Sequence, residues 1–332
     1  MRVGSLCTGY GGLDMAVERV LGGRMVWYSE FEKHPSTLLS ARFPGLPNLG
    51  DLTKIDWAVV PPVDVLTGGY PCQPFSVAGK RLGEDDPRHL WPHIREAIRV
   101  LRPRITFLEN VSNHRRIGFD RVLGDCAEDG LDVRWVSVRA SDVGAPHRRE
   151  RLFFVVTDPY REQREERRLA LASSAEYPTA DARLGPIPDP ADDGLTGGGL
   201  HGDGGRDLRT AVADTWGLGC EWRGAAPVET GGAQSAVVGL RPVTEYEPAI
   251  RRWEHLTRPA PAPTEPNKNG NPRLTAEFDE WMMGLPEGWI TDIDIPYGAK
   301  IKLCGNGVVP QQGERALRLL LNLTQHETEG YG

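Results

Sequence analysis

The chain has 332 residues, with 39 Lys and Arg against 46 Asp and Glu and a formal net charge of −7. This length allows a large buried core and predicts two domains. No apolar stretch follows a basic start, and no run reaches the length of a membrane-spanning helix, so we expect a soluble cytosolic protein without a membrane partner. The net negative charge argues against binding polyanions by general electrostatic attraction.

The charge is unevenly distributed along the chain. Residues 1–157 hold 21 Lys and Arg against 19 Asp and Glu, residues 158–272 hold 13 against 18, and residues 273–332 hold 5 against 9. Phosphate contacts are therefore expected only at the basic clusters of the first segment, at 80–81, 115–116 and 148–151. Each cluster taken singly is more typical of a solvated surface.

The first 157 residues alternate short apolar runs with segments of helical periodicity. Strands are predicted over residues 3–6, 25–28, 63–66, 105–108, 133–138 and 152–156, with another expected at Asp51, and helices over 13–21 and 91–101. This alternation predicts an α/β fold with a doubly wound, mostly parallel sheet.

The composition changes after residue 157. A charged stretch at 161–168 and Gly- and Asp-rich sequence at 183–209 predict a smaller, loop-rich second domain. It is expected to end at the Pro-Ala-Pro-Ala-Pro segment 259–263, a stiff extended linker. Helical patterns return at 275–283 and 314–323. We therefore divide the chain into residues 1–157, 158–272 and 273–332.

Cys72 lies in the most informative segment. Residues 68–76 read Gly-Gly-Tyr-Pro-Cys-Gln-Pro-Phe-Ser and follow the predicted strand at 63–66. Because open α/β sheets bind ligands at the carboxyl ends of their strands, a cysteine fixed there between prolines is placed like a nucleophile. A small buried core residue is the alternative interpretation. The other cysteines (Cys7, Cys126, Cys220 and Cys304) are scattered, which predicts neither disulfides nor a metal site.

A glycine-rich turn and two acids indicate a cofactor that contains adenosine. Gly9, Gly11 and Gly12 link the first strand to its helix, where a nucleotide-like ligand can approach the backbone. The spacing is not the full dinucleotide fingerprint, so an ordinary tight turn is the alternative. Glu30, at the end of the second strand, can accept hydrogen bonds from ribose hydroxyls, and Asp51 can accept one from an adenine amino group.

Glu109 ends the strand that follows the one leading to Cys72. Adjacent parallel strands would bring its carboxyl group close to the thiol, where it could act as an acid or hydrogen-bond partner. Capping of the next helix is the alternative. Arg149 and Arg151 alternate just before a buried strand, so both could point toward the same cleft.

Together these motifs resemble those of the DNA (cytosine-5) methyltransferases of restriction-modification or phage type. The resemblance covers nearly the whole chain in the family's order. It comprises the loop 5–12, Glu30, Asp51, the Pro-Cys loop 69–76, Glu-Asn-Val at 109–111, His-Arg-Arg-Glu-Arg at 147–151, Arg-Leu-Thr-x-Glu at 273–277 and Gly-Asn-Gly-Val-Val-Pro-Gln at 305–311. One motif alone would be weak evidence, whereas the ordered set is very specific.

The resemblance implies a Rossmann-like methyltransferase fold, S-adenosyl-L-methionine as cofactor and double-stranded DNA as substrate. It assigns residues 1–157 to a catalytic domain, 158–272 to a target-recognition domain and 273–332 to a segment that returns to the catalytic domain. The residues implied to bind the cofactor are Leu6, Cys7, Gly9, Tyr10, Gly11, Gly12, Leu13, Glu30, Phe31, Asp51, Leu52, Gly69, Pro71, Asn306 and Val308. Those implied to contact DNA are Gln73, Ser76, Lys80 and Arg81. Cys7 stands where the family often has a Phe that packs on the adenine, and Phe31 stands where a Trp is common. These two differences are expected to affect the affinity for the cofactor.

The implied mechanism is covalent. Cys72 attacks C6 of a cytosine flipped out of the duplex, Glu109 holds or protonates N3, Arg151 holds O2 and Arg149 supports the site. The enamine takes a methyl group from the cofactor, after which a base, expected to be water, removes the C5 proton and the thiol leaves. Residues 75–86 are expected to form a lid over the DNA backbone.

Other functions remain open at this point. Some members of the family methylate transfer RNA, and a catalytically silent DNA-binding or restriction-regulating protein is a further alternative. Thymidylate synthases also add a Pro-Cys thiol to C6 of a pyrimidine, but the adenosine-binding features argue against them.

The resemblance also implies partners and a location. It implies a monomer in the cytoplasm of a bacterial or phage-infected cell, and it raises a cognate restriction endonuclease, without a stable complex, as a partner. Sequence recognition is expected within 158–272. The candidate residues there are Arg206, Arg209, Arg223 and Arg241.

Overall fold

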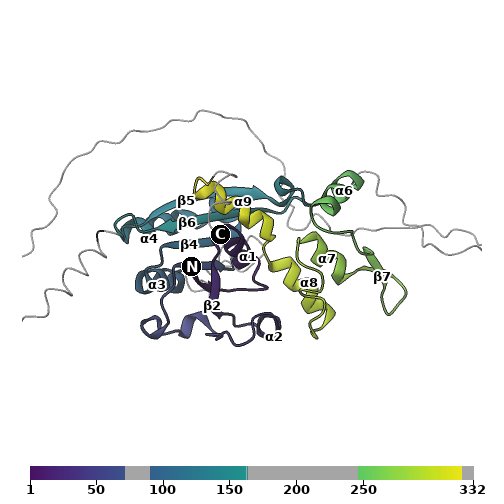
Figure 1. The fold of residues 1–332 in the computed structure, drawn as a ribbon, viewed down its shortest axis with the longest axis horizontal. Coiled ribbons are helices and arrows are strands. Elements are labelled where there is room, and N and C mark those ends of the chain that lie inside the picture. Colours follow the sequence, from purple (N-terminus) through teal and green to yellow (C-terminus); the bar gives the residue numbers. More distant parts are fainter. Residues whose placement is uncertain (72–89, 162, 164–245, 324–332) are drawn as a thin grey trace, which may run out of the picture. The chain divides into compact units, whose positions relative to one another are not determined.

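A computed structural model describes residues 1–71, 90–161, 163 and 246–323 (Figure 1). The chain divides into one compact unit, residues 1–171 and 242–332, and a second unit, residues 172–241, which lies outside the described residues. The assignment of 158–272 to a recognition domain stays a prediction. The residues implied to contact DNA by the resemblance and the candidates for sequence recognition lie outside the described part of the chain; they are Gln73, Ser76, Lys80, Arg81, Arg206, Arg209, Arg223 and Arg241.

The first unit is built on a six-stranded sheet in the order β2-β1-β3-β4-β6-β5. Strands β1 to β4 are parallel, and β6 runs antiparallel to both of its neighbours. The sheet is therefore mostly parallel, as predicted. Its strands are β1 (Arg2–Leu6), β2 (Arg24–Ser29), β3 (Val65–Gly69), β4 (Ile105–Val111), β5 (Asp132–Arg139) and β6 (Glu150–Thr157).

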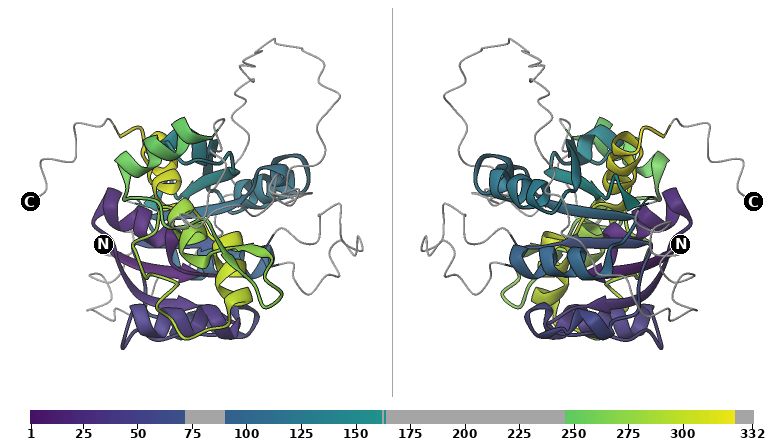
Figure 2. Two further views of the ribbon diagram at one scale, coloured as in Figure 1. Left: turned by 90° about the vertical axis from the view of Figure 1, so that its right-hand side faces the viewer. Right: turned by 90° about the vertical axis from the view of Figure 1, so that its left-hand side faces the viewer.

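Helices cover both faces of the sheet (Figure 2). A separate two-stranded sheet pairs β7 (Thr264–Pro266) with β8 (Pro272–Leu274). No helix among the described residues is long and apolar enough to cross a membrane. The helices are α1 (Gly12–Leu21), α2 (Lys33–Arg42), α3 (Trp91–Leu101), α4 (Phe119–Glu128), α6 (Glu247–Leu256), α7 (Ala276–Met282), α8 (Tyr297–Asn306) and α9 (Pro310–Leu320).

Side chains that alternate along the strands divide the core into two layers. Leu66 of β3 and Leu108 of β4 belong to the cluster that includes Trp91 of α3. Their neighbours Val65 and Phe107 belong to the cluster on the other face, which α1 and α9 complete. Burial on both faces explains why the central strands are continuously apolar in sequence.

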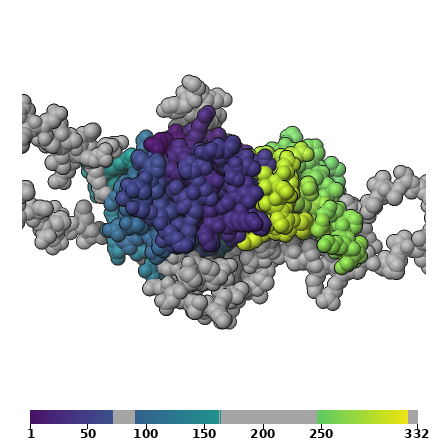
Figure 3. All heavy atoms as spheres, turned by 90° about the horizontal axis from the view of Figure 1, so that it is seen from below, coloured from purple at the N-terminus to yellow at the C-terminus, as the bar shows by residue number. Residues whose placement is uncertain are grey.

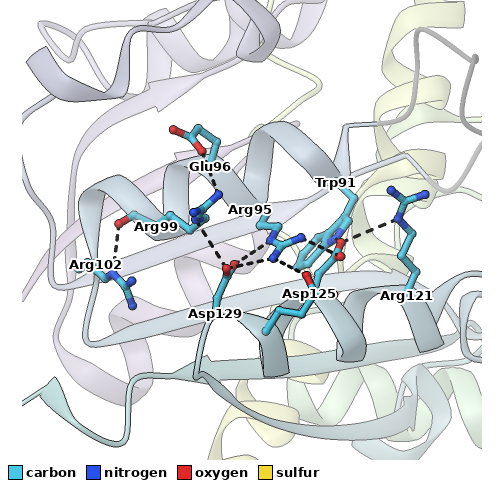
Figure 4. Close-up of polar contacts among 9 residues, drawn as sticks. Trp91, Arg95, Glu96, Arg99, Arg102, Arg121, Asp125 and Asp129 are labelled. Atoms are coloured by element: carbon cyan, nitrogen blue, oxygen red, sulfur yellow. Dashed lines mark hydrogen bonds and ion pairs between the residues drawn. The ribbon is translucent and has the colours of Figure 1, made fainter. Parts of the chain in front are cut away.

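Polar contacts join α3 to α4 on the first of these faces (Figure 4). Arg95 of α3 donates to Asp125 at 2.8 Å and to Asp129 at 2.7 Å. Trp91 donates through its indole nitrogen to Asp125 at 2.6 Å, and its ring centroid lies 6.3 Å from that of Tyr70. These contacts fix the start of α3 beside the chain that leaves β3.

The C-terminal segment packs against the N-terminal part of the unit (Figure 3, yellow beside purple). Gly313 of α9 packs against Ala16 of α1, where an added Cβ would stand 3.1 Å from the alanine methyl group. On the surface, Lys302 of α8 forms an ion pair with Glu32 at 2.5 Å. The last part of the chain is therefore integral to the sheet-bearing unit.

One local prediction was wrong. Asp51 does not lie in a strand: it caps a short 3₁₀ helix (Leu52–Lys54) by accepting from Thr53, and the only pairing nearby is a single bridge between Tyr28 and Asn48. The segment 259–263, predicted as a stiff extended linker, contains no helix or strand, and Thr275 donates to the carbonyls of residues 262 and 263 through its hydroxyl and amide groups.

Candidate active site

A pocket opens at the carboxyl ends of β1 and β3. Its wall is formed by the loop 5–10 after β1, residues 67–69 at the end of β3, residues 306–308 after α8, the first turn of α1 and Glu109 of β4. Four distant segments of sequence therefore converge where an open parallel sheet places its ligands.

The loop after β1 turns sharply with the help of glycine. Gly9 and Gly11 have φ of 60° and 82°, a region that side chains rarely adopt, and nothing lies within 4 Å of a Cβ placed on Gly9. The Glu30 carboxylate accepts the amide hydrogens of Gly9 and Glu32, both at 2.9 Å. Burial raises the pKa of Glu30. Glu30 thus fixes the loop, and its carboxylate oxygens can still accept hydrogen bonds from a ligand.

The first and last motifs are interlocked. The Tyr10 hydroxyl donates to the carbonyl oxygen of Val308 at 2.8 Å. A Cβ on Gly12 would collide with that same carbonyl, and one on Gly307 would collide with the Tyr10 ring. These glycines are required because the two backbones approach too closely for any side chain.

Asp14 is a buried acid beneath the pocket. Its carboxylate accepts hydrogen bonds from Thr67 at 2.6 Å and Ser5 at 2.9 Å. Burial raises the pKa of Asp14 to about 6 even though both hydroxyls favour the charged form. The carboxylate ties α1 to the ends of β1 and β3.

Glu109 faces the chain that leads to Cys72. It is the register partner of Gly69 on β3, and a Cβ placed on Gly69 would stand 3.3 Å from its Oε2. Arg151 forms an ion pair with Glu109, with Nε 2.9 Å from Oε1; the Glu109 side chain is buried and that of Arg151 is half-buried. Burial raises the pKa of Glu109, and the nearby Arg151 and Arg149 oppose this effect.

Arg149 serves a different purpose from Arg151. Its guanidinium donates to the carbonyl oxygens of Gly305, at 2.8 Å, and Gly307. Its backbone is held at φ 33°, with the carbonyl bonded to Gln312 Nε2 at 2.8 Å. Burial lowers the pKa of Arg149 to about 10. The residue therefore anchors the C-terminal motif to the pocket wall.

His147 and Cys7 are not reactive groups in this arrangement. His147 Nε2 donates to the carbonyl of Met282 at 3.0 Å, and burial lowers the pKa of this histidine to about 4. Burial, with Glu30 nearby, raises the pKa of Cys7 to about 12. A neutral imidazole and a protonated thiol fill structural positions here.

The structure brings together most, but not all, of the predicted cofactor residues. Phe31 is 74% exposed, and the carboxylate of Asp51 is bonded to Thr53. Cys72 lies outside the described residues. The predicted residues that line the pocket are Leu6, Cys7, Gly9, Tyr10, Gly12, Leu13, Gly69, Glu109, Asn306 and Val308. The predicted cofactor and catalytic residues absent from its described wall are Gly11, Glu30, Phe31, Asp51, Leu52, Pro71, Arg149 and Arg151.

Sequence reasoning missed four polar groups of the wall. They are Ser5, Thr8, Asp14 and Thr67. Ser5 and Thr8 belong to the quoted loop, so their place in that motif was a usable signal. The sequence around Asp14 and Thr67 gave no such signal, because an acid in the first turn of a helix and a threonine in a strand are common in any α/β protein.

The mostly parallel sheet and the pocket at its carboxyl edge define an α/β protein with a ligand site at the usual edge of such a sheet. Its structure resembles a mutant of DNMT2 from Spodoptera frugiperda, with a TM-score of 0.56 at 15% identity over 96% of this chain and 99% of that one. The chain belongs to the family of C-5 cytosine-specific DNA methylases, whose family model matches residues 1–320.

Characterised relatives are bacterial type II methyltransferases. M1.ScrFI from Lactococcus lactis subsp. cremoris is 37% identical over 158 residues, which is 46% of this chain and 40% of that protein. M.NgoBI from Neisseria gonorrhoeae is 35% identical over 155 residues, 45% of this chain and 48% of that protein. The matched segment thus spans less than half of either relative.

Proposed function

We propose that this chain transfers a methyl group from S-adenosyl-L-methionine to C5 of a flipped cytosine within a specific sequence of double-stranded DNA. One observation carries the proposal. Glu109, buried against Arg151, lines the same pocket as the glycine loop and lies beside Gly69, three residues before Cys72. An acid, an adenosine-type loop and the start of the chain that leads to Cys72 thus meet at one edge of the sheet.

The pocket fits the proposed cofactor. The open space at Gly9 leaves the loop backbone accessible, and residues 306–308 provide the opposite wall. Glu30 would hold the ribose hydroxyls, and the exposed ring of Phe31 is available to stack on the adenine. When bound, the cofactor supplies an electrophilic methyl group.

Glu109 would act as the acid for the cytosine ring. Burial raises its pKa, which makes the carboxyl group a better proton donor at neutral pH than an exposed glutamate, although the nearby Arg151 and Arg149 oppose this shift. A protonated Glu109 can donate to N3 as the ring gains electrons, while the adjacent Arg151 would hold O2. Arg149, bonded to Gly305 and Gly307, would keep the pocket wall in place.

Cys72 would supply the nucleophile. Its sulfur would form a bond to C6, and the electron pair displaced onto C5 would attack the methyl group. Loss of the C5 proton to a base, which we expect to be water, would restore the ring double bond and expel the thiolate. Gln73, Ser76, Lys80 and Arg81 would contact the flipped base and its backbone.

The biological setting belongs to the same proposal. The relatives are named as type II methyltransferases, which supports action beside a cognate restriction endonuclease in a bacterial or phage-infected cell. We propose a cytoplasmic monomer that forms no stable complex with that endonuclease.

A direct test is methyl transfer from radiolabelled cofactor to plasmid DNA, with bisulfite mapping of the product. The wild-type protein should modify cytosines in one sequence context, and it should become trapped covalently on DNA that contains 5-fluorocytosine. C72S should lose both activities while it retains cofactor affinity and thermal stability.

Three outcomes would contradict parts of the proposal. A fully active C72S would exclude the covalent route. If the protein transferred the labelled methyl group to transfer RNA and not to DNA, transfer RNA would be its substrate. DNA binding by the wild-type protein without methyl transfer would indicate the silent regulatory homologue.

A further inference from the structure

Tyr70 links the end of β3 to Pro71, and it is held at three places. Its ring is 6% exposed and packs edge-on to Phe154, with the ring centroids 6.5 Å apart. Its backbone carbonyl accepts from Asn110 Nδ2 at 3.1 Å. Its hydroxyl lies 2.9 Å from His114 Nε2. This residue is therefore fixed at the backbone and at the tip of its side chain.

The geometry around His114 assigns the direction of that last hydrogen bond. The imidazole is buried, with 3% exposed, and its Nδ1 lies 3.1 Å from the carbonyl oxygen of Ile117. A carbonyl can only accept, so Nδ1 carries the hydrogen in the neutral ring, and Nε2 accepts from the Tyr70 hydroxyl. The imidazole therefore connects Tyr70 to the backbone of the 3₁₀ helix Ser112–Arg116 and its cap.

The two polar contacts described for Tyr70 come from the segment that directly follows Glu109. Asn110 is the next residue of β4 after the acid, and His114 lies in the 3₁₀ helix that follows the strand. Tyr70 is separated from Cys72 by Pro71 alone, a path of at most about 7 Å between the two Cα atoms. The acid and the start of the cysteine loop are thus connected through side chains as well as through the sheet.

We propose that His114 is a positioning residue for the methyl-transfer reaction. By holding the Tyr70 hydroxyl, it fixes the point at which the Cys72 loop leaves the sheet relative to Glu109. This inference rests on the proposed function, since it assigns a role in the reaction at the same site. A buried hydrogen bond that served stability alone would leave turnover unchanged when it is removed.

Three substitutions separate these roles. Y70F removes one oxygen and keeps the ring packing. H114N keeps an amide donor near the position of Nδ1, for Ile117, and loses the acceptor for Tyr70. H114Q places an amide oxygen near the position of Nε2, so it can still accept from Tyr70. Y297F is the matched control, because the Tyr297 hydroxyl donates to the Leu274 carbonyl at 2.7 Å outside the pocket.

We expect kcat and the rate of trapping on 5-fluorocytosine DNA to fall about tenfold in Y70F and H114N, the effect of one misplaced contact. H114Q should stay within about threefold of wild type, and Y297F should lose stability but not turnover. Cofactor affinity should be unchanged in all four variants. The double variant Y70F/H114N should be no slower than either single variant, because both remove the same hydrogen bond.

Two results would overturn the inference. One is wild-type kcat in folded Y70F and H114N, which would leave the hydrogen bond a purely structural role. The other is multiplication of the two losses in the double variant, which would show that the residues act independently. Absence of methyl transfer by the wild-type protein would instead remove the proposed function, and this inference with it.

Discussion

Glu109 and Gly69 are register partners on adjacent parallel strands, and the glutamate carboxyl group covers the glycine where a side chain would otherwise stand. The pairing sets the acid opposite a residue only three positions before Cys72. Hydrogen bonds between β3 and β4 therefore fix the acid relative to the start of the chain that leads to Cys72, and a side chain on Gly69 would shift the carboxyl group by a few tenths of an ångström.

Glu109→Gln tests the acid. The amide keeps the size and can still donate a hydrogen bond, but it cannot deliver a proton to N3. We expect turnover to fall by roughly two orders of magnitude or more, as for one positioned acid, with cofactor affinity almost unchanged. Single-turnover kinetics and calorimetry measure the two quantities separately. If this variant instead lost its affinity for the cofactor, the Glu109 carboxyl group would belong to the cofactor site and not to the cytosine site.

Gln312→Leu tests the support of Arg149. Gln312 is fully buried and donates to the carbonyls of Val138, at 2.7 Å, and Arg149. Its loss removes both of these hydrogen bonds, so we expect the free energy of unfolding to fall by about 1–3 kcal/mol. Gln311→Leu is the control, because Gln311 donates once, to Gly284, and is half-buried. Equal losses in denaturant titrations of the two variants would refute this role.

Asp14→Asn tests the buried acid beneath the pocket. Burial raises the pKa of Asp14 from 3.8 to about 6. The folded state therefore favours the neutral acid, and this stabilisation is complete below pH 4 and lost as the pH rises through 6. Asparagine does not ionise, so the stability of the variant relative to wild type should rise between pH 4 and pH 7, by at most about 3 kcal/mol.

Thermal or denaturant unfolding at several pH values checks the Asp14 prediction. Asp279, whose pKa burial also raises to about 6, is present in both proteins, and its contribution cancels in the comparison. A relative stability that does not change with pH would show that Asp14 is ionised in the folded protein.

Arg115→Gln with Arg116→Gln tests a phosphate-binding surface. Both side chains are exposed, and neither forms an ion pair with any described residue, whereas Arg99 of α3 pairs with Glu96 and Asp129. Each phosphate contact contributes about 0.9 to the slope of log affinity against log salt concentration. We expect the slope for duplex DNA to decrease by about 2 in the double variant. The control variant Arg99→Gln should show the wild-type slope. If the Arg115→Gln/Arg116→Gln variant also showed the wild-type slope, these two arginines would not contact DNA phosphates.

Much of the fold could be predicted because the central strands are buried on both faces. A continuous apolar run such as 105–108 leaves little choice of structure. The strand expected at Asp51 failed for a local reason: Gly50 adopts φ 73° and the Asp51 carboxylate captures the amide of Thr53, so the chain turns.

The candidate site was predictable where backbone order alone brings groups together. Adjacent parallel strands were enough to bring Glu109 near the chain that leads to Cys72. Partners chosen by side-chain packing were not predictable. His114 stands in Ser-Asn-His-Arg-Arg, which looks like a solvated basic cluster, yet its ring is buried against Tyr70 and Phe119. Only the tertiary fold distinguishes it from the exposed arginines that follow.

The bond between Tyr10 and Val308 has a consequence for synthesis. These residues are 298 positions apart, yet each forms part of the same pocket wall. At about 5–20 residues per second, a ribosome needs roughly 15–60 s to pass from one to the other. During that interval the glycine loop exists without its opposite wall. A nascent chain therefore cannot assemble this pocket before residues 306–308 have emerged from the ribosome. We expect the chain to bind the proposed cofactor only after the C-terminal motif has been translated.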